Sequence, residues 1–197
     1  MFREIKPEIR ILGWDDSAFT PKDKNTLLIG VVCRGGSQID GIITARIRID
    51  GTDATRQIID ATSKSPHYKQ IRVLMLDGLT FGGFNIADMQ KIHKSLKMPV
   101  IVVIRSKPDS ENIRKSLGIF KDHEKRWKNI EKAGIIRTFR IRKFANAKRN
   151  MVYCQYVGID ERLVEKILNL TSIHSLTPEP LRIAHMIGHG LKGRKIL

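Results

Sequence analysis

The hydrophobic pattern of the sequence predicts two kinds of strand. Continuous apolar runs indicate buried strands, and alternation of apolar and polar residues indicates half-exposed ones. Residues 73–76 (Val-Leu-Met-Leu) and 100–104 (Val-Ile-Val-Val-Ile) are short and entirely apolar, which is typical of strands covered on both faces. Apolar and polar residues instead alternate from Ile43 to Ile49, as expected of an antiparallel strand with one face in solvent. The first 49 residues therefore predict a three-stranded antiparallel meander, with strands at 9–14, 27–33 and 39–49.

Helical patterns alternate with strands in the rest of the chain. Asp53 opens a helix that Pro66 ends, and Asn85 or Asp88 is positioned to cap another helix that runs to about Leu96. The order of three antiparallel strands followed by α-β-α-β favours an α/β sandwich around a mixed sheet, with helices on both faces. Further helices are predicted at 109–117, 121–132, 161–170 and 180–187, and further strands at 135–141 and 151–157. We expect one domain over residues 1–197, with a loose basic tail at 188–197.

A large positive charge distinguishes this chain from an average soluble protein. Its formal net charge is +16, and residues 105–150 contain 15 Lys and Arg against 5 Asp and Glu. Such a surplus favours a polyanionic partner, of which nucleic acid is the commonest. A Lys- and Arg-rich surface of the thermophilic or ribosome-associated kind is the open alternative. If the partner is nucleic acid, we expect its backbone to be bound by Lys107, Arg126, Lys128, Arg137, Arg140, Arg142, Lys143, Lys148 and Arg149.

Several classes of protein are disfavoured by what the sequence lacks. Cys33 and Cys154 lie in apolar contexts typical of buried thiols, and no Cys/His cluster has the spacing of a zinc site. No apolar run is long enough for a membrane helix, and the charged N-terminus does not have the pattern of a signal peptide. We therefore expect a cytoplasmic protein with reduced thiols and no membrane partner.

Acidic residues stand at the ends of three predicted strands. Asp15 follows the first strand, Asp53 the third and Asp77 the fourth. If the first and fourth strands are neighbours, the Asp15 and Asp77 carboxylates face one another and repel unless a divalent cation lies between them. Oxygen ligands of this kind suit Mg²⁺ or Mn²⁺, and such an ion can activate water for phosphodiester hydrolysis. The alternative is that these acids cap helices or close turns. Asp53 is the acid to which this alternative applies most.

Basic and histidine side chains are candidates to complete such a site. Arg105 and Lys107 follow the strand at 100–104, where a cation can hold a scissile phosphate, although a solvated strand end is the alternative. Three histidines near the C-terminus could also approach a site, but no metal-ligand spacing marks them: His174, His185 and His189.

Four segments, in order along the chain, resemble motifs of endonuclease V, a ribonuclease H-like nuclease family that cuts near deaminated bases. A small family of endonuclease-V-like proteins of similar length is an even closer match. The segments are Gly13–Phe19 (GWDDSAF), Asp77-Gly78, Met98–Ser106 (MPVIVVIRS) and Pro178–Ala184 (PEPLRIA). The resemblance implies a ribonuclease H-like fold, metal binding by Asp15 and Asp77, and Arg105 at the position of the family's catalytic lysine. Asp53 is the best match to the family's second acid, a glutamate, and is expected to complete the metal shell or to orient water.

The sequence departs from the family pattern at motifs that concern recognition of the substrate. Leu79 replaces the histidine of the Asp-Gly-His-Gly motif, Gly158-Ile159 replaces a later Gly-His, and the family's Pro-Tyr-Ile-Pro wedge has no counterpart near residues 42–46. The resemblance therefore implies a Mg²⁺- or Mn²⁺-dependent endonuclease for DNA with a damaged base, uracil as readily as hypoxanthine. Two alternatives stay open: a non-catalytic nucleic-acid-binding protein of the same fold, and a nuclease for structured or inosine-containing RNA.

Overall fold

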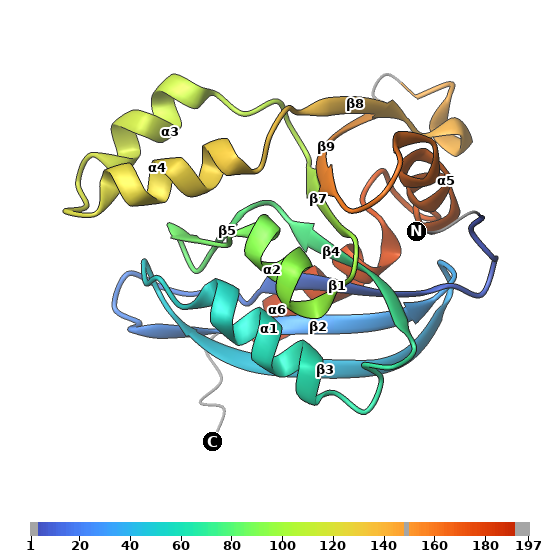
Figure 1. The fold of residues 1–197 in the computed structure, drawn as a ribbon, viewed down its shortest axis with the longest axis horizontal. Coiled ribbons are helices and arrows are strands. Elements are labelled where there is room, and N and C mark those ends of the chain that lie inside the picture. The colour runs from blue at the N-terminus through green and yellow to red at the C-terminus, as the bar shows by residue number, and fades with distance from the viewer. Residues whose placement is uncertain (1–3, 148–149, 192–197) are drawn as a thin grey trace.

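A seven-stranded mixed sheet forms the centre of the computed structural model, which describes residues 4–147 and 150–191 (Figure 1). Its strands lie side by side in the order β3-β2-β1-β4-β7-β9-β8. In chain order they are β1 (Arg10–Asp16), β2 (Asn25–Arg34), β3 (Gln38–Arg48), β4 (Ile71–Asp77), β7 (Val100–Ile104), β8 (Arg137–Arg140) and β9 (Met151–Val157). A separate small hairpin consists of β5 (Thr80–Phe81) and β6 (Asn85–Ile86).

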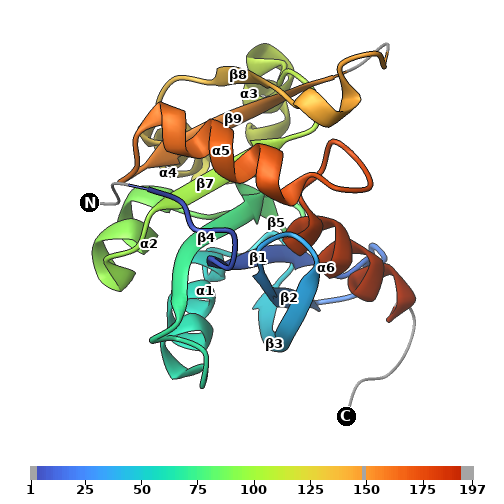
Figure 2. The same cartoon turned by 90° about the vertical axis from the view of Figure 1, so that its right-hand side faces the viewer.

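Helices cover both faces of this sheet. In the described residues they are α1 (Ala54–Lys64), α2 (Met89–Leu96), α3 (Ser110–Leu117), α4 (His123–Lys132), α5 (Glu161–Thr171) and α6 (Glu179–Gly190), with a short 3₁₀ helix η1 (Arg142–Phe144). Helices α1 and α2 pack on one face and α5 and α6 on the other, while α3 and α4 form a pair to one side (Figures 1 and 2). The predicted α/β class, a mixed sheet with helices on both faces, is confirmed. Within the described ranges, no helix is long and apolar enough to cross a bilayer.

Alternate residues of the central strands face the two helical layers. Leu12 of β1 and Leu74 of β4 belong to the apolar cluster beneath α1 and α2. Their neighbours Ile11 and Met75 belong to the cluster beneath α5. Because both faces are covered, four successive residues of β4, Val73 to Leu76, are all buried, which explains the continuous apolar run in its sequence.

The strand directions bring the ends of β1, β4 and β7 to one edge of the sheet. β1 pairs antiparallel with β2, and β2 antiparallel with β3, so the predicted meander is confirmed. β1 pairs parallel with β4, and β4 parallel with β7. Trp14 is the register partner of Leu76, which places Asp15 and Asp77 side by side at the next position. We call the edge where β1, β4 and β7 end the carboxyl edge.

Missing side chains at two glycines let α6 lie directly on β1. A Cβ atom at Gly13 would come within 2.6 Å of Pro180, and one at Gly188 within 2.8 Å of a carbonyl oxygen at the end of β1. The hydroxyl of Ser17 donates a hydrogen bond of 2.8 Å to the carbonyl oxygen of Gly188. These contacts fix the position of the whole helix relative to the carboxyl edge.

The end of the chain differs from the prediction. Residues 188–190 belong to α6 rather than to a loose tail, because the turn at Gly188 packs against the end of β1. Residues 192–197, which make up most of the predicted tail, lie outside the described part of the chain.

Candidate metal centre

Two carboxylates and an imidazole converge at the carboxyl edge of the sheet. Asp15 comes from β1, Asp77 from the last position of β4, and His185 from the middle of α6. Each side chain offers one ligand atom, and these three atoms lie within 4.8 Å of one another. Asp15 is buried and the other two residues are partly exposed, so the cluster has an interior wall and an open side. We call this group the metal cluster.

The structure disfavours the ionised forms of the carboxylates at the carboxyl edge. Burial, together with the neighbouring Asp77 carboxylate, raises the pKa of Asp15 to about 8. Burial also raises the pKa of Asp16, whose Oδ2 accepts a hydrogen bond of 2.7 Å from the Gly82 amide. A positive charge placed between such groups favours their ionised forms. The metal cluster therefore favours a bound cation.

Two nitrogen-bearing side chains already contact the acids. Arg105 donates a hydrogen bond to Oδ2 of Asp77, and Nδ1 of His185 lies 2.8 Å from Oδ2 of Asp15. Burial, together with the nearby Arg105 and His189, lowers the pKa of His185. Because the neutral imidazole is the form that ligates metals, this environment suits His185 to a ligand role.

The donor set of the metal cluster fits a divalent ion. Mg²⁺ binds oxygen at about 2.0–2.1 Å, so its ligand atoms lie at most about 4.2 Å apart. A group whose ligand atoms lie within 4.8 Å of one another needs only small side-chain movements to reach that geometry. Two carboxylates and one imidazole form a mostly oxygen set, which suits Mg²⁺ or Mn²⁺. Asp15, Asp77 and His185 are therefore the residues that can hold the ion.

His185 is the member of the cluster that the sequence indicated only as one of three histidines that could approach a site. It directly follows Ala184, the last residue of the Pro178–Ala184 segment, and this adjacency is the signal that would have identified it. Only the packing of α6 on β1 brings the imidazole to Asp15, 170 positions away along the chain. The packing of α6 is therefore what distinguishes His185 from the other two candidate histidines.

An ion-pair network fixes the start of α6. Glu179 is buried, and its carboxylate accepts hydrogen bonds of 2.9 and 2.7 Å from the guanidinium of Arg182. Nδ1 of His174 lies 3.1 Å from the same carboxylate. Burial raises the pKa of Glu179, but the hydrogen bonds from Arg182 and His174 outweigh it, so the pKa lies below its usual value. This network holds the helix that carries His185.

Asp53 lies outside the metal cluster, although the sequence led us to expect it among the ligands. Its Oδ1 accepts hydrogen bonds from Nδ2 of Asn85 at 2.7 Å and from the backbone amide of Arg48 at 3.3 Å. The buried Asn85 also accepts a hydrogen bond of 2.9 Å from the Ala54 amide and so caps α1. Asp53 therefore holds the turn between β3 and α1 through Asn85 and Arg48, and its own side chain does not cap the helix.

Arg126 is buried, so it is not available for the contact with the nucleic-acid backbone that the sequence led us to expect. Only 7% of the residue is accessible. Its guanidinium donates to the Asp122 carboxylate at 2.7 Å and to the carbonyl oxygens of Asp50 at 2.9 Å, Gly51 at 3.1 Å and Phe84 at 2.6 Å. These bonds join α4 to two loops of the carboxyl edge, so Arg126 is a structural residue.

Most of the other basic residues predicted to bind nucleic acid are at the surface. The exposed ones are Lys107, Lys128, Arg137, Arg140, Arg142 and Lys143. Arg142 also forms an ion pair of 3.0 Å with Glu165. Lys148 and Arg149 lie outside the described residues.

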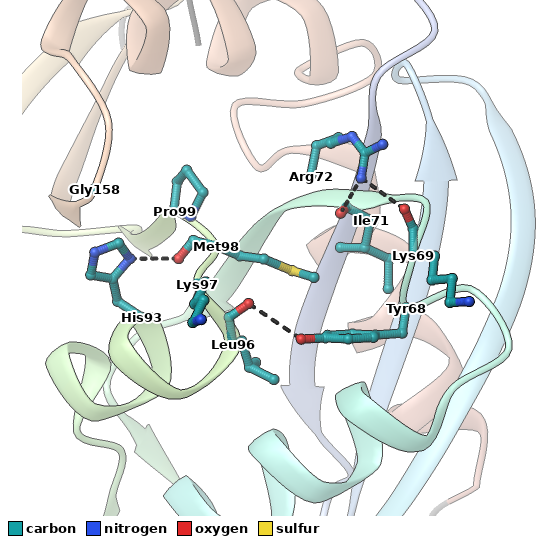
Figure 3. A pocket seen from close by; sticks show the side chains of 10 residues that line it. All are labelled: Tyr68, Lys69, Ile71, Arg72, His93, Leu96, Lys97, Met98, Pro99 and Gly158. Carbon is teal, nitrogen blue, oxygen red and sulfur yellow. Dashed lines mark hydrogen bonds between the residues drawn. The ribbon is translucent and has the colours of Figure 1, made fainter. Parts of the chain in front are cut away.

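A pocket of about 660 Å³ lies at the opposite end of β4 from the metal cluster (Figure 3). Its walls include Ile71, the first residue of β4, and Pro99, which precedes β7. A strand of seven residues spans roughly 20 Å, and this length separates the pocket from the cluster. The described residues that line it include Lys69, Arg72 and Lys97 but no acid, so the pocket offers no carboxylate to a metal ion.

Comparison with known proteins places this chain in a family. The sequence model of the family described as endonuclease dU matches residues 7–192. The chain belongs to the endonuclease dU family. The matched range includes Asp15, Asp77 and His185, so the whole metal cluster lies in the part that defines the family.

Relatives of this endonuclease dU family member match it over nearly their full length. A UPF0215 protein from Methanosarcina mazei is 46% identical over 188 residues, which cover 95% of this chain and 92% of the relative. The crystal structure of a protein of unknown function from Archaeoglobus fulgidus is similar with a TM-score of 0.82 and 32% identity, covering 94% of this chain and 99% of the other.

Endonuclease V structures share the fold of the endonuclease dU chain at low sequence identity. The Bacillus subtilis enzyme matches with a TM-score of 0.63 and 14% identity, covering 95% of this chain and 83% of that one. Ciona intestinalis endonuclease V, in complex with a 24mer DNA containing an inosine followed by a ribo-adenosine, has a TM-score of 0.55 and 13% identity, covering 89% and 82%. At such identities the likeness shows the fold alone. The predicted ribonuclease H-like fold and the resemblance to endonuclease V are confirmed.

Proposed function

We propose that this chain is a metal-dependent endonuclease that hydrolyses a DNA phosphodiester near a deaminated base, with deoxyuridine as the first lesion to test. The observation that carries the proposal is the convergence of Asp15, Asp77 and His185 from three separate elements. The description of the family, endonuclease dU, supports both the nuclease activity and the choice of lesion. The DNA bound to the Ciona structure supports nucleic acid as the partner of this fold.

Each residue at the carboxyl edge has a role that its position supports. A divalent ion, Mg²⁺ or Mn²⁺, would act as a Lewis acid that activates water and neutralises charge on the phosphate. Asp15, Asp77 and His185 would hold that ion. The Arg105 side chain contacts Asp77 and is 48% exposed, so it can reach a phosphate and stabilise the leaving oxygen. Lys107, two positions further, adds positive charge to the same approach.

Exposed basic residues carry the contact with the nucleic-acid backbone in this proposal. They are Lys107, Lys128, Arg137, Arg140, Arg142 and Lys143. Each phosphate contact releases counterions, so the affinity for DNA should fall steeply as salt is raised, whatever the base sequence. We further propose, from the sequence pattern, that the protein acts in the cytoplasm.

Cleavage of labelled duplexes tests the proposed activity. In Mg²⁺ or Mn²⁺ the protein should nick a duplex that contains one uracil, and EDTA should abolish the nick. The Asp77→Asn variant should cut at least on the order of 10²-fold more slowly, because it loses a ligand that positions the charge-stabilising ion. Its Mn²⁺ affinity, measured by calorimetry without DNA, should fall as well. Asp60→Asn is the matched control, since this α1 acid lies 3.7 Å from Arg56 and outside the metal cluster.

The same assay separates the proposal from its two alternatives. Salt-sensitive binding without cutting in any metal would favour a non-catalytic nucleic-acid-binding protein of this fold. Cutting of uracil- or inosine-containing RNA, with no cutting of matched DNA, would favour an RNA nuclease. Undiminished cutting by Asp77→Asn would contradict the metal centre itself.

A further inference from the structure

The open face of β3 carries two arginines that are not among the contacts predicted for nucleic acid. Alternate residues of this strand, at positions 43, 45 and 47, pack into the apolar cluster beneath α1. The residues between them point to the opposite face of the sheet. On that face Arg46 and Arg48 are both exposed, and Arg48 is the last residue of the strand.

The strand register relates this open face to the metal cluster. Asp15 of β1 is opposite Ile29 of β2, and Ile29 is opposite Thr44 of β3. Side chains that are directly opposite one another point to the same face of a sheet, so Thr44 shares the face of Asp15. Arg46 and Arg48 follow at two-residue steps and share it too. Ile29 packs against α6, the helix that completes the metal cluster. The two arginines therefore lie beside α6, on the face of the sheet that holds the cluster.

Strand geometry gives the distances from Asp15 to the two arginines. Neighbouring strands are about 4.8 Å apart, so the Cα atom of Thr44 lies roughly 10 Å from that of Asp15. Each residue advances about 3.4 Å along a strand, which puts Arg46 roughly 12 Å and Arg48 roughly 17 Å from Asp15. A DNA strand also advances about 3.4 Å per nucleotide, so these distances correspond to roughly three to five nucleotides.

The positive charges of both arginines are available to a ligand. Among the described residues, Arg46 forms no ion pair. The guanidinium of Arg48 lies 3.9 Å from the carboxylate of Asp53, and its side chain is 74% exposed. Guanidinium groups bind phosphate oxygens through paired hydrogen bonds. Since the acids of the metal cluster repel a DNA strand, positive charge beside them favours its approach.

The two arginines lie on the other side of the metal cluster from the basic residues of β8. The two acids of the cluster come from β1 and β4, which are inner strands, whereas β3 and β8 form the two edges of the sheet (Figure 1). Arg137 and Arg140 belong to β8. A DNA strand whose phosphate is held at the cluster continues in both directions. Contacts on the β8 side alone would leave one of these directions unsupported.

We propose that Arg46 and Arg48 bind phosphates of the cleaved DNA strand about three to five nucleotides from the bond at the metal cluster, on the side away from β8. This inference rests on the proposed function. Contacts with phosphates carry no sequence information, but they fix the position of a duplex on the protein. The β3 arginines would therefore align the strand so that the phosphate next to the lesion reaches the metal cluster.

Single neutral phosphates test these contacts. A set of uracil-containing duplexes is prepared, each with one methylphosphonate at a different position on either side of the uracil, and binding is measured in EDTA. Wild type should bind several-fold more weakly when a contacted phosphate is neutral. Arg46→Gln should lose this sensitivity at a position about three to four nucleotides from the cut, because the contact is already absent, and should keep it on the other side of the cut.

Salt dependence gives a second measurement. Combining Arg46→Gln with Arg48→Gln should lower the slope of log affinity against log salt by about two, one for each lost phosphate contact. In cutting assays the double variant should raise KM more than it lowers kcat, since neither arginine contacts the reacting phosphate. Arg56→Gln is the matched control for Arg46→Gln. It removes the same charge from an arginine whose side chain is 62% exposed, but on α1, which covers the other face of the sheet.

The outcomes separate this inference from the proposed function. Equal weakening of DNA binding by Arg56→Gln and Arg46→Gln, or a methylphosphonate pattern that Arg46→Gln leaves unchanged, would overturn the β3 contacts. Failure of wild type to cut uracil-containing DNA in Mg²⁺ or Mn²⁺ would overturn the proposed function instead. The binding measurements in EDTA require no cutting, so they would still decide whether Arg46 and Arg48 bind phosphate.

Discussion

Replacing the buried Arg126 with methionine should destabilise the whole protein. Methionine fills a similar volume but removes four hydrogen bonds, to the Asp122 carboxylate and to the carbonyl oxygens of Asp50, Gly51 and Phe84. Removing one partner of a buried, hydrogen-bonded charge costs about 3–5 kcal/mol. Simple addition of four bonds at about 1.5–3 kcal/mol each would give more, but water can enter and rehydrate part of the site. We expect the net loss in the free energy of unfolding to be about 3–5 kcal/mol.

Urea denaturation and calorimetry measure this loss directly. For a domain of 150–250 residues, 1 kcal/mol lowers Tm by roughly 2–4 °C, so the expected fall is roughly 6–20 °C. Lys128→Met is the matched control, because Lys128 lies on the same helix and is exposed. A surface change of this kind should alter the free energy of unfolding by less than about 0.5 kcal/mol.

DNA binding by the same two variants separates the structural role from the role that the sequence indicated. If Lys128 contacts a phosphate, Lys128→Met should reduce the salt dependence of binding by about one phosphate contact. The folded fraction of Arg126→Met should keep the salt dependence of wild type. An Arg126→Met protein with an unchanged denaturation midpoint and weaker DNA binding would refute the reasoning, since the guanidinium would then face solvent.

Two further predictions concern α6. Gly188→Ala should cost about 1–3 kcal/mol of stability and weaken Mn²⁺ binding in calorimetry, because its Cβ would press on the end of β1 and shift His185. Gly190→Ala is the control and should be neutral or stabilising, because a Cβ at this position meets nothing within 4 Å. Equal effects of the two substitutions would contradict this packing. The hydrogen bonds from Arg182 and His174 lower the pKa of Glu179 in the folded protein below its ordinary value of 4.5. The ionised Glu179 therefore contributes stability above pH 4.5, and this contribution is lost as the pH falls below that value. Glu179→Gln should therefore unfold more easily than wild type at pH 7, with the gap narrowing towards pH 3, and a gap independent of pH would count against the ion pair.

Much of the fold could be predicted because burial leaves a local record in the sequence. The apolar runs of β4 and β7 record strands covered on both faces, and the alternation in β3 records an edge strand with a solvent face. The predicted strand at 135–141 is shortened to Arg137–Arg140, because Ile135 is exposed despite its apolar side chain. An exposed isoleucine looks the same as a buried one in a one-dimensional pattern, so such errors are inherent to that evidence.

The candidate site was less predictable because long-range packing decides which polar side chains meet. Asp15 and Asp77 could be expected to meet, since parallel neighbouring strands end at the same edge. Asp53 also stands near that edge, but whether it faces the cluster or the start of α1 depends on the buried Asn85, 32 positions away. Arg126 looked like its exposed basic neighbours, because sequence composition does not record which cation is turned inward.

The pairing of Arg105 with Asp77 connects the resting site to the proposed reaction. Two acids this close need a positive charge beside them, and in the structure the guanidinium of Arg105 supplies part of it at Asp77. A divalent ion held by Asp15 and Asp77 would supply that charge more strongly, so Asp77 would no longer require the guanidinium. Arg105 would then be free to bind a phosphate within reach of its partly exposed side chain. An arginine at this position can therefore serve the acids before the ion binds and the substrate afterwards.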